Sequence, residues 1–293
     1  MIKKVIFSVL SSMILFMSCS SDDDSKIVLP TNSELTLNLN GLEPLGPDFV
    51  YEGWIIVDGE PISTGTFSSV TFPQSFTVNR SQLNNATMFV LSIEPAIDTD
   101  PAPAETKILA GPFSGSSAQV DSNSIVGDFR SASGTYILAT PTDMDDTNEA
   151  SGVWFLDNTT GSPMVGLDLP TLQNGWKYEG WAVIDGMPVS TGTFTDIMDF
   201  DNNAATSPYK GDSGNGPSYP GEDFLQNAPN GLSFPTDLRG ATVVISVEPY
   251  PDNSPMPFTL KPLAHVVPND AMVHSAINMA EGPTVSLSGT VTR

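Results

Sequence analysis

Two acidic segments have the composition of cation-binding loops. Their carboxylate and amide side chains are Asp143, Asp145, Asp146 and Glu149 in the first segment and Asp199, Asp201 and Asn203 in the second. Calcium binds several oxygen ligands from close-set carboxylates and carbonyls. Neither segment has the glycine at position six and the glutamate at position twelve of an EF-hand loop. We therefore predict no cofactor and expect both segments to form solvated acidic turns, with calcium binding at either segment as the alternative.

A pair of glutamates lies at matching points of two apolar runs. Glu94 and Glu248 each stand directly before a proline. Glycoside hydrolysis requires two carboxyl groups roughly 5 to 10 Å apart. An acid and a nucleophile need different environments, whereas these two glutamates share one sequence context. We therefore predict no catalytic residues and expect both glutamates to have a hydrogen-bonding or turn role.

The remaining reactive side chains form no recognisable catalytic motif. His265 and His274 are the only histidines and could bind zinc together with a carboxylate, but the compact spacing of a zinc-protease motif is missing. The sequence contains one cysteine, Cys19, and neither a phosphate-binding glycine-rich loop nor a Gly-x-Ser-x-Gly elbow. These features predict a protein that is not an enzyme.

The N-terminus has the features of an export signal. Lys3 and Lys4 precede an uncharged, mainly apolar run, Val5–Met17, which ends just before Cys19. A membrane-spanning helix needs roughly 20 apolar residues, so this shorter run fits the apolar region of a signal peptide. We predict a lipoprotein signal peptide at residues 1–18 and lipidation of Cys19. Ordinary secretion with cleavage near Cys19 is the alternative.

The segment after the signal is polar. Residues 19–33 contain too little apolar surface to fold and are predicted to form a tether. Asp22, Asp23 and Asp24 follow the cysteine closely. An acidic run at this place resembles the surface-export signal of Bacteroidetes lipoproteins, which implies a lipid anchor in the outer membrane and exposure on the cell surface. A solvated spacer without a signal is the alternative.

The charge of the chain argues against nucleic acid as a partner. The formal net charge is −23 at pH 7. Proteins contact phosphate backbones mainly with Lys and Arg, and a strongly acidic surface repels them. The predicted partners are the membrane, through the lipid, and an unidentified envelope protein or glycan.

Two blocks of sequence occur twice. Tyr51–Phe67 (YEGWIIVDGEPISTGTF) and Tyr178–Phe194 (YEGWAVIDGMPVSTGTF) share 12 of 17 residues, and Phe89–Pro103 is similar to Val243–Pro257. Such internal similarity indicates a duplication. The second copy has 27 more residues between its blocks than the first, which places an insertion at about residues 199–235. Its Asn, Gly, Pro and Ser content is typical of a loop, and a loop of this length is usually functional or disordered.

Apolar periodicity predicts strands throughout the two copies. Leu35, Leu37 and Leu39 alternate with polar residues, as in a half-buried strand. Asp-Gly pairs at residues 58–59 and 185–186 lie between apolar runs, and this pair is a strong hairpin signal because the turn needs positive φ. No segment shows a sustained helical period.

The strands are expected to form an all-β fold after the signal peptide and tether. We predict two tandem β-sandwich repeats, residues 34–160 and 161–293, or one sandwich with pseudo-two-fold symmetry. Residues 134–140 and 152–157 should form a hairpin at the end of the first repeat.

Four aromatic residues recur at a spacing of three. Tyr51 and Trp54 in the first copy match Tyr178 and Trp181 in the second. In a strand this spacing puts the two members of each pair on opposite faces. Exposed rings would stack on sugars, but aromatic residues in repeated strands more often fill a core, which is our prediction.

The order of these motifs has a counterpart in a known family. Both copies contain Tyr-x-x-Trp, three apolar residues, Asp-Gly-x-Pro and Gly-x-Phe, followed by a run ending in Ser-apolar-Glu-Pro. This order resembles the C-terminal extracytoplasmic domain of anti-sigma-K factors, the RskA-like family, over about Leu35–Phe113 and Met164–Val267. The resemblance implies an exported β-sandwich shared with sensor proteins. It implies no active site and no binding of a sigma factor, which those proteins hold with a separate cytoplasmic helical domain.

Three functions follow in order of preference. The first is a surface-anchored, non-enzymatic lipoprotein that serves as a binding or structural module of the cell envelope, with the loops, including residues 199–235, as its binding surface. The second is an envelope sensor that regulates an anti-sigma-like pathway through a partner protein. The third is a glycan-active enzyme.

Overall fold

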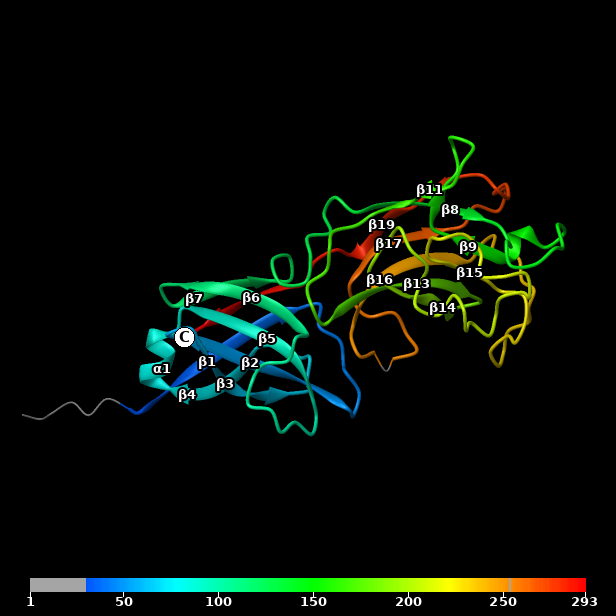
Figure 1. Ribbon diagram of the computed structural model, residues 1–293. Helices are drawn as coiled ribbons and strands as arrows, with labels where there is room; N and C mark the ends of the chain where they lie inside the picture. Colours follow the sequence, from blue (N-terminus) through cyan, green and yellow to red (C-terminus); the bar gives the residue numbers. More distant parts are fainter. Residues whose placement is uncertain (1–29, 253) are drawn as a thin grey trace, which may run out of the picture. The chain divides into compact units, whose positions relative to one another are not determined.

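The computed structural model describes residues 30–252 and 254–293 (Figure 1). The predicted signal peptide, Cys19 and most of the predicted tether lie outside these residues. The described chain is nearly all β, which confirms the predicted fold class, and its sheets have sandwich-like or barrel-like arrangements. The helical elements of the described part are α1 (Arg80–Asn85) and one 3-10 turn, η1 (Glu149–Ser151).

The largest sheet of the described residues has eight strands in the order β3-β2-β5-β6-β7-β20-β1-β4, and all neighbours are antiparallel. Its strands are β1 (Asn32–Asn40), β2 (Phe49–Val57), β3 (Glu60–Phe67), β4 (Gln74–Asn79), β5 (Met88–Pro95), β6 (Lys107–Ser114), β7 (Ser117–Asp121) and β20 (Ser288–Thr292). Phe67 of β3 and Phe76 of β4 have ring centroids 5.6 Å apart. The two edges of the sheet therefore approach each other, and the sheet curls around its own core.

A second sheet has the order β14-β13-β16-β17-β19. Its strands are β13 (Trp176–Ile184), β14 (Met187–Phe194), β16 (Thr242–Pro249), β17 (Lys261–Val266) and β19 (Ala280–Thr284). β13 lies between β14 and β16 as β2 lies between β3 and β5. The matching sequence blocks thus form matching strand arrangements.

Short strands form the remaining sheets. The order β12-β8-β9-β15 is extended by β18, which also pairs with β8, and β10 pairs with β11. The strands are β8 (Ser133–Leu138), β9 (Gly152–Trp154), β10 (Leu156–Asp157), β11 (Met164–Val165), β12 (Leu167–Asp168), β15 (Gly221–Asp223) and β18 (Ile277–Asn278). Ile137 pairs with Trp154 and Leu138 with Val153, so the predicted hairpin of β8 and β9 is confirmed.

Both Asp-Gly turns have the predicted backbone. Asp58 and Gly59 have φ of 54° and 89°, and Asp185 and Gly186 have 51° and 81°. Positive φ at both central residues defines the type I′ turn, whose twist matches that of the flanking strands. The two hairpins share one register, and each has an irregularity at the Gly-Trp step of its first strand.

Strand pairing crosses the predicted boundary at residue 160. β20 lies between β7 and β1, β18 pairs with β8, and β15 of the insertion pairs with β9. Residues 31–293 form one compact unit. Local sequence patterns specify that a segment is a strand but not its distant partner, which is why these pairings were not predicted.

The main core contains the side chains that the alternation predicted. Leu35, Leu37 and Leu39 of β1 are buried in it, and Tyr51 and Tyr178 are almost fully buried. An aromatic residue buries about 150–250 Å², so each tyrosine contributes several kcal/mol at about 25 cal/mol per Å². The predicted core role of these two aromatic residues is confirmed. Within the described residues, no helix is long and apolar enough to span a membrane.

Candidate acidic site and neighbouring cavity

A tryptophan, a serine and a glutamate form the same hydrogen-bond chain in both copies. Trp54 Nε1 donates to Ser92 Oγ at 2.8 Å, and Ser92 donates to Glu94. In the second copy, the Nε1 atom of Trp181 lies 2.7 Å from the hydroxyl of Ser246, which in turn bonds to Glu248. Both tryptophans are buried, outside the main core. They therefore satisfy their indole N–H groups inside the protein, as buried tryptophan requires.

Each glutamate also holds the loop that follows its strand. Glu94 Oε1 accepts the backbone N–H of Ala104 at 2.8 Å, and Lys107 Nζ donates to the carbonyl of the same alanine at 2.9 Å. Glu94 is only 1% exposed. A buried carboxylate that accepts two hydrogen bonds is stabilised where it lies. Glu94 and Lys107 thus bond to the N–H and the carbonyl of Ala104, and together they fix the loop between β5 and β6.

The second copy repeats this closure. Glu248 Oε1 accepts the backbone N–H of Phe258 at 2.9 Å, and Lys261 Nζ donates to the Phe258 carbonyl at 2.5 Å. Glu248 is also 1% exposed. The predicted hydrogen-bonding role of the two glutamates is confirmed.

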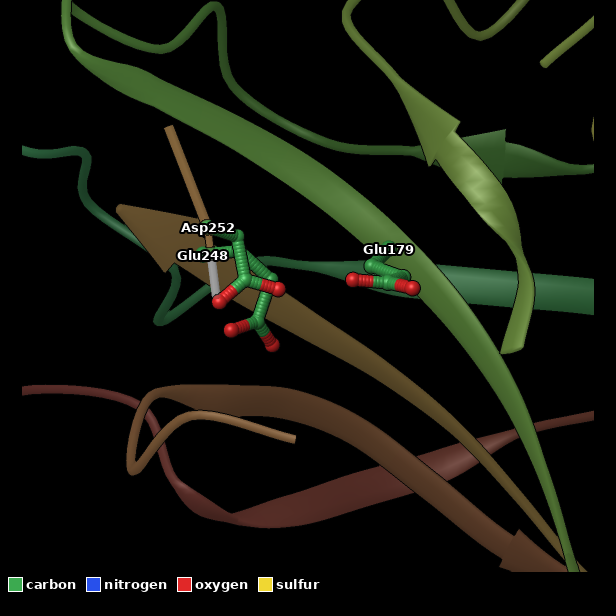
Figure 2. Close-up of side chains that lie close together, drawn as sticks. All are labelled: Glu179, Glu248 and Asp252. Atoms are coloured by element: carbon green, nitrogen blue, oxygen red, sulfur yellow. The ribbon is translucent and has the colours of Figure 1, made fainter. Parts of the chain in front are cut away.

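Three carboxylates meet beside this chain in the second copy. One carboxylate oxygen each from Glu179, Glu248 and Asp252 lies within 4.8 Å of the other two (Figure 2). Glu179 lies on β13 opposite Ser246 of β16, so Glu248 occupies a diagonal position on the same face. Asp252 follows in the loop after β16. The pairing of β13 with β16 thus assembles the cluster from distant sequence positions.

The cluster has unusual electrostatics for carboxylates. The pKa of Glu248 is raised to about 8, mainly by burial and to a smaller extent by the charges of Glu179 and Asp252, while the hydrogen bonds from Ser246 and Phe258 act to lower it. Burial also raises the pKa of Glu179 to about 7, with a smaller contribution from Asp252. Both effects disfavour the charged carboxylate. The protein therefore holds acidic groups together where they repel one another.

One oxygen of each buried glutamate has no hydrogen bond. Glu179 Oε1 accepts the Ser190 hydroxyl, but Glu179 Oε2 has no donor within the described residues. Glu248 Oε2 likewise has none in that part of the chain. The two residues are 5% and 1% exposed, respectively. Buried polar atoms are nearly always hydrogen-bonded, and an exception needs an explanation.

The equivalent residues of the first copy are more open. Glu52, Glu94 and Asp98 match the three acidic residues of the second copy and line a cavity of about 400 Å³. Glu52 accepts a hydrogen bond from Ser63, as Glu179 does from Ser190. Glu52 is only partly buried and Asp98 is exposed. Water can therefore solvate Glu52 and Asp98, whereas Glu94 is buried.

A larger cavity adjoins the acidic cluster. It has a volume of about 610 Å³ and is lined by residues 43–49, 104–106, 248–252, 254–255 and 258, together with Ile93 and Pro95. Prolines and aromatic residues dominate the lining, and it also includes Glu248 and Asp252 of the cluster. Small-molecule sites are mostly apolar cavities with a few well-placed polar groups. This cavity has that composition.

The first predicted calcium segment uses its acidic side chains in local turns. Asp143 accepts from Asn148 Nδ2 at 2.7 Å, Asp145 accepts from the Thr147 N–H at 2.9 Å, and Asp146 is exposed. Glu149 accepts the Thr140 N–H at 2.8 Å. In the part of the chain that the structure describes, these residues do not join a cluster of three metal-binding side chains.

The second predicted segment also folds locally. Asp199 accepts the N–H of Phe200, and Asp201 accepts the N–H groups of Asn203 and of Gly221 in β15. Burial raises the pKa of Asp201 to about 6. Asp201 therefore links the start of the insertion to its strand. Over residues 30–252 and 254–293, this segment provides no grouping of three metal-binding side chains either.

The insertion carries buried carboxylates that the sequence did not single out. Asp223 is fully buried and accepts hydrogen bonds from Thr142 N at 2.8 Å and Trp154 Nε1 at 2.7 Å. Burial raises the pKa of Asp223 to about 6 and that of its neighbour Glu222 to about 8. These contacts join the insertion to the β8–β9 hairpin. At this point the insertion is part of the packed body.

The two histidines have different partners. His265 Nδ1 lies 3.0 Å from the hydroxyl of Tyr136, and His274 Nε2 lies 3.3 Å from Glu149 Oε2. His274 has a positive φ of 56°. The two side chains contribute to separate local contacts, as the sequence context suggested.

Comparison with known proteins gives one family relationship. Residues 25–108 match the family described as Anti-sigma-K factor rskA, C-terminal. The match covers the first of the two copies and leaves the second unmatched. No curated protein and no solved structure matches the chain. The first copy is therefore similar to the C-terminal region of an anti-sigma-K factor.

Proposed function

We propose that this protein is an envelope sensor module that regulates an anti-sigma-like signalling pathway through a partner protein. The observation that carries the proposal is the similarity of residues 25–108 to the C-terminal region of an anti-sigma-K factor. This observation favours a signalling role over a purely structural envelope lipoprotein.

The cavity of about 610 Å³ is the proposed ligand site of the module. Its lining combines residues of both copies, including Phe49 of β2 and Phe258 before β17. A ligand that fills it would contact the loops closed by Glu94 and Glu248. Binding there would bias the arrangement of these loops, which is how a ligand shifts a conformational equilibrium.

The proposed placement is on a lipid anchor at Cys19, in the outer membrane and facing outward. The support is the sequence order of basic residues, apolar run and single cysteine. Metabolic labelling with an alkyne fatty acid should modify the wild-type chain and leave Cys19→Ala unlabelled. Equal labelling of both chains would refute the anchor. The proposed function is non-enzymatic, and turnover of an envelope glycan by the purified chain would contradict it.

The regulatory role is tested in the native host. Transcription of sigma-dependent genes is compared between a strain lacking the gene, the same strain with the gene restored, and one expressing Phe258→Arg, which places a charge in the cavity. We expect loss of the gene to change one sigma regulon, restoration to reverse it, and Phe258→Arg to resemble the deletion at normal protein levels. Unchanged transcription in the deletion strain would overturn the proposal.

A further inference from the structure

The two buried glutamates of the acidic cluster in the second copy have no neutralising ion pair within the described residues. Among residues 30–252 and 254–293, neither Glu179 nor Glu248 forms an ion pair within 4.0 Å. Lys261, the nearby cation that affects Glu248, has its ammonium group bonded to the Phe258 carbonyl. An uncompensated buried charge is strongly destabilising. Protonation or a bound cation would each relieve the repulsion within the cluster.

We propose that Glu179, Glu248 and Asp252 bind a calcium ion. The ion would lie between β13 and the end of β16, beside the larger cavity. This inference is independent of the proposed signalling function.

The unpartnered oxygens point to a ligand. Oε2 of Glu179 and Oε2 of Glu248 are buried and accept no hydrogen bond within the described part of the chain, while Oε1 of each is held by a serine. The serine contacts fix the orientation of both carboxylates. Hydrogen bonds that orient a metal-binding carboxylate are a regular feature of metal sites. The free oxygen of each group is thus the one available to an ion.

The separation of the oxygens fits calcium. Calcium–oxygen distances are about 2.3–2.6 Å, so two ligands on opposite sides of the ion lie about 5 Å apart. The oxygens of the cluster lie within 4.8 Å of one another (Figure 2). Magnesium demands a tighter octahedron at about 2.0–2.1 Å and keeps several waters. A set of three carboxylates, two of them buried, is therefore better suited to calcium.

The first copy supplies an internal comparison. Glu52 and Asp98 there are solvated, whereas Glu179 is buried. Solvation removes the need for a counter-ion, so the same three residue types should bind calcium much more weakly in the first copy. The duplication thereby provides a matched control within one molecule.

The test is calorimetric titration of the full chain, purified in detergent, with calcium chloride. The variants are Glu179→Gln and Asp252→Asn in the second copy, with Glu52→Gln as the matched control. Glu60→Gln controls for a unit change of net charge at an exposed position outside every candidate site. Glutamine retains an oxygen that can accept from Ser190, so Glu179→Gln should fold.

We expect the wild-type chain to bind calcium and its melting temperature to rise with the ion. Glu179→Gln and Asp252→Asn should each weaken binding about tenfold or more, because affinity follows the charge of the ligand set. Glu52→Gln and Glu60→Gln should leave binding unchanged. Terbium luminescence, excited through Trp181, should respond in the same order.

Absence of heat with no change in melting temperature would overturn the site. So would binding that survives both second-copy substitutions but is lost in Glu52→Gln or Glu60→Gln. Circular dichroism checks that each variant is folded, and Asp252→Asn keeps the proposal falsifiable should Glu179→Gln misfold. Loss of calcium binding and loss of the transcriptional effect are separate measurements, so either proposal can fail alone.

Discussion

Glu94 and Glu248 occupy the same place in two copies of one hydrogen-bond chain. Each accepts the hydroxyl of the serine two residues earlier and the backbone N–H of the residue ten positions later. In each case a tryptophan donates to that serine from the neighbouring strand. These hydrogen bonds connect the strand of the tryptophan, the strand of the glutamate and the loop that follows the glutamate. Because the arrangement occurs twice, each substitution in one copy can be compared with the equivalent substitution in the other.

Removing the serine of this chain should destabilise the protein. Ser246→Ala leaves the buried Trp181 N–H without its acceptor and Glu248 without one donor. An unsatisfied buried polar group costs about 1–3 kcal/mol. Ser92→Ala should have a similar effect through Trp54. Urea unfolding measures both, with the exposed Ser131→Ala as a control. A midpoint for Ser246→Ala equal to that of Ser131→Ala would contradict the structural role of the chain.

The hydroxyl of each of the two equivalent tyrosines, Tyr51 and Tyr178, should contribute less to the free energy of unfolding than its ring. Tyr178 OH donates to the Pro170 carbonyl at 2.6 Å, while its ring stacks on Phe194 with centroids 5.5 Å apart. Tyr178→Phe should cost about 1 kcal/mol, and Tyr178→Ala about 3–5 kcal/mol. Thermal unfolding of both variants provides the comparison, and equal losses would show that the ring packing is unimportant.

Stability should fall with rising pH because of Glu222. Burial raises its pKa to about 8, from an ordinary value of 4.5. The folded state therefore binds more protons than the unfolded state between these values, so the stabilisation is present below about pH 5 and lost as pH rises through about 8. Glu222→Gln should flatten the decline of the melting temperature over this range.

The control for this prediction is the exposed Glu60→Gln, which changes net charge equally. It should leave the slope of melting temperature against pH unchanged. A decline of the same slope in Glu222→Gln as in the wild type would assign the effect to general charge repulsion in this acidic protein.

Two equivalent glycines should differ in their tolerance of alanine. Gly65 and Gly192 have φ of 118° and 120°, so an added side chain strains both backbones equally. A Cβ at Gly192 would also lie 1.9 Å from Asn203 Oδ1, whereas at Gly65 its nearest contact is Phe76 at 3.4 Å. Gly192→Ala should therefore cost roughly 1–3 kcal/mol more than Gly65→Ala. Equal unfolding midpoints would show that residues 201–203 can move away from the added methyl group without loss of stability.

Local patterns were sufficient to predict several strands and both Asp-Gly turns of this fold. The alternation of Leu35, Leu37 and Leu39 reports a single buried face, and an Asp-Gly pair has few alternatives to a tight hairpin turn. The position of β20 could not be read in this way. Its pairing with β1 and β7 depends on which edges remain open after the rest of the chain has packed.

The acidic site was missed for a similar reason. Glu179 lies in one repeated block and Glu248 and Asp252 in the other, and only the pairing of β13 with β16 brings them together. A signal was present, because all three acidic residues recur at the matching positions Glu52, Glu94 and Asp98. The predicted calcium segments were chosen for their density of carboxylates. In short turns, such carboxylates accept hydrogen bonds from neighbouring backbone N–H groups.

The position of β20 has a consequence for how the protein is made. A chain grows from its N-terminus, and domains generally fold as they emerge. Here β1 and β7 remain without their shared neighbour until residues 288–292 have been synthesised. Until then both present open strand edges, which readily pair with other chains. Nascent chains that stall before residues 288–292 would therefore be prone to aggregate.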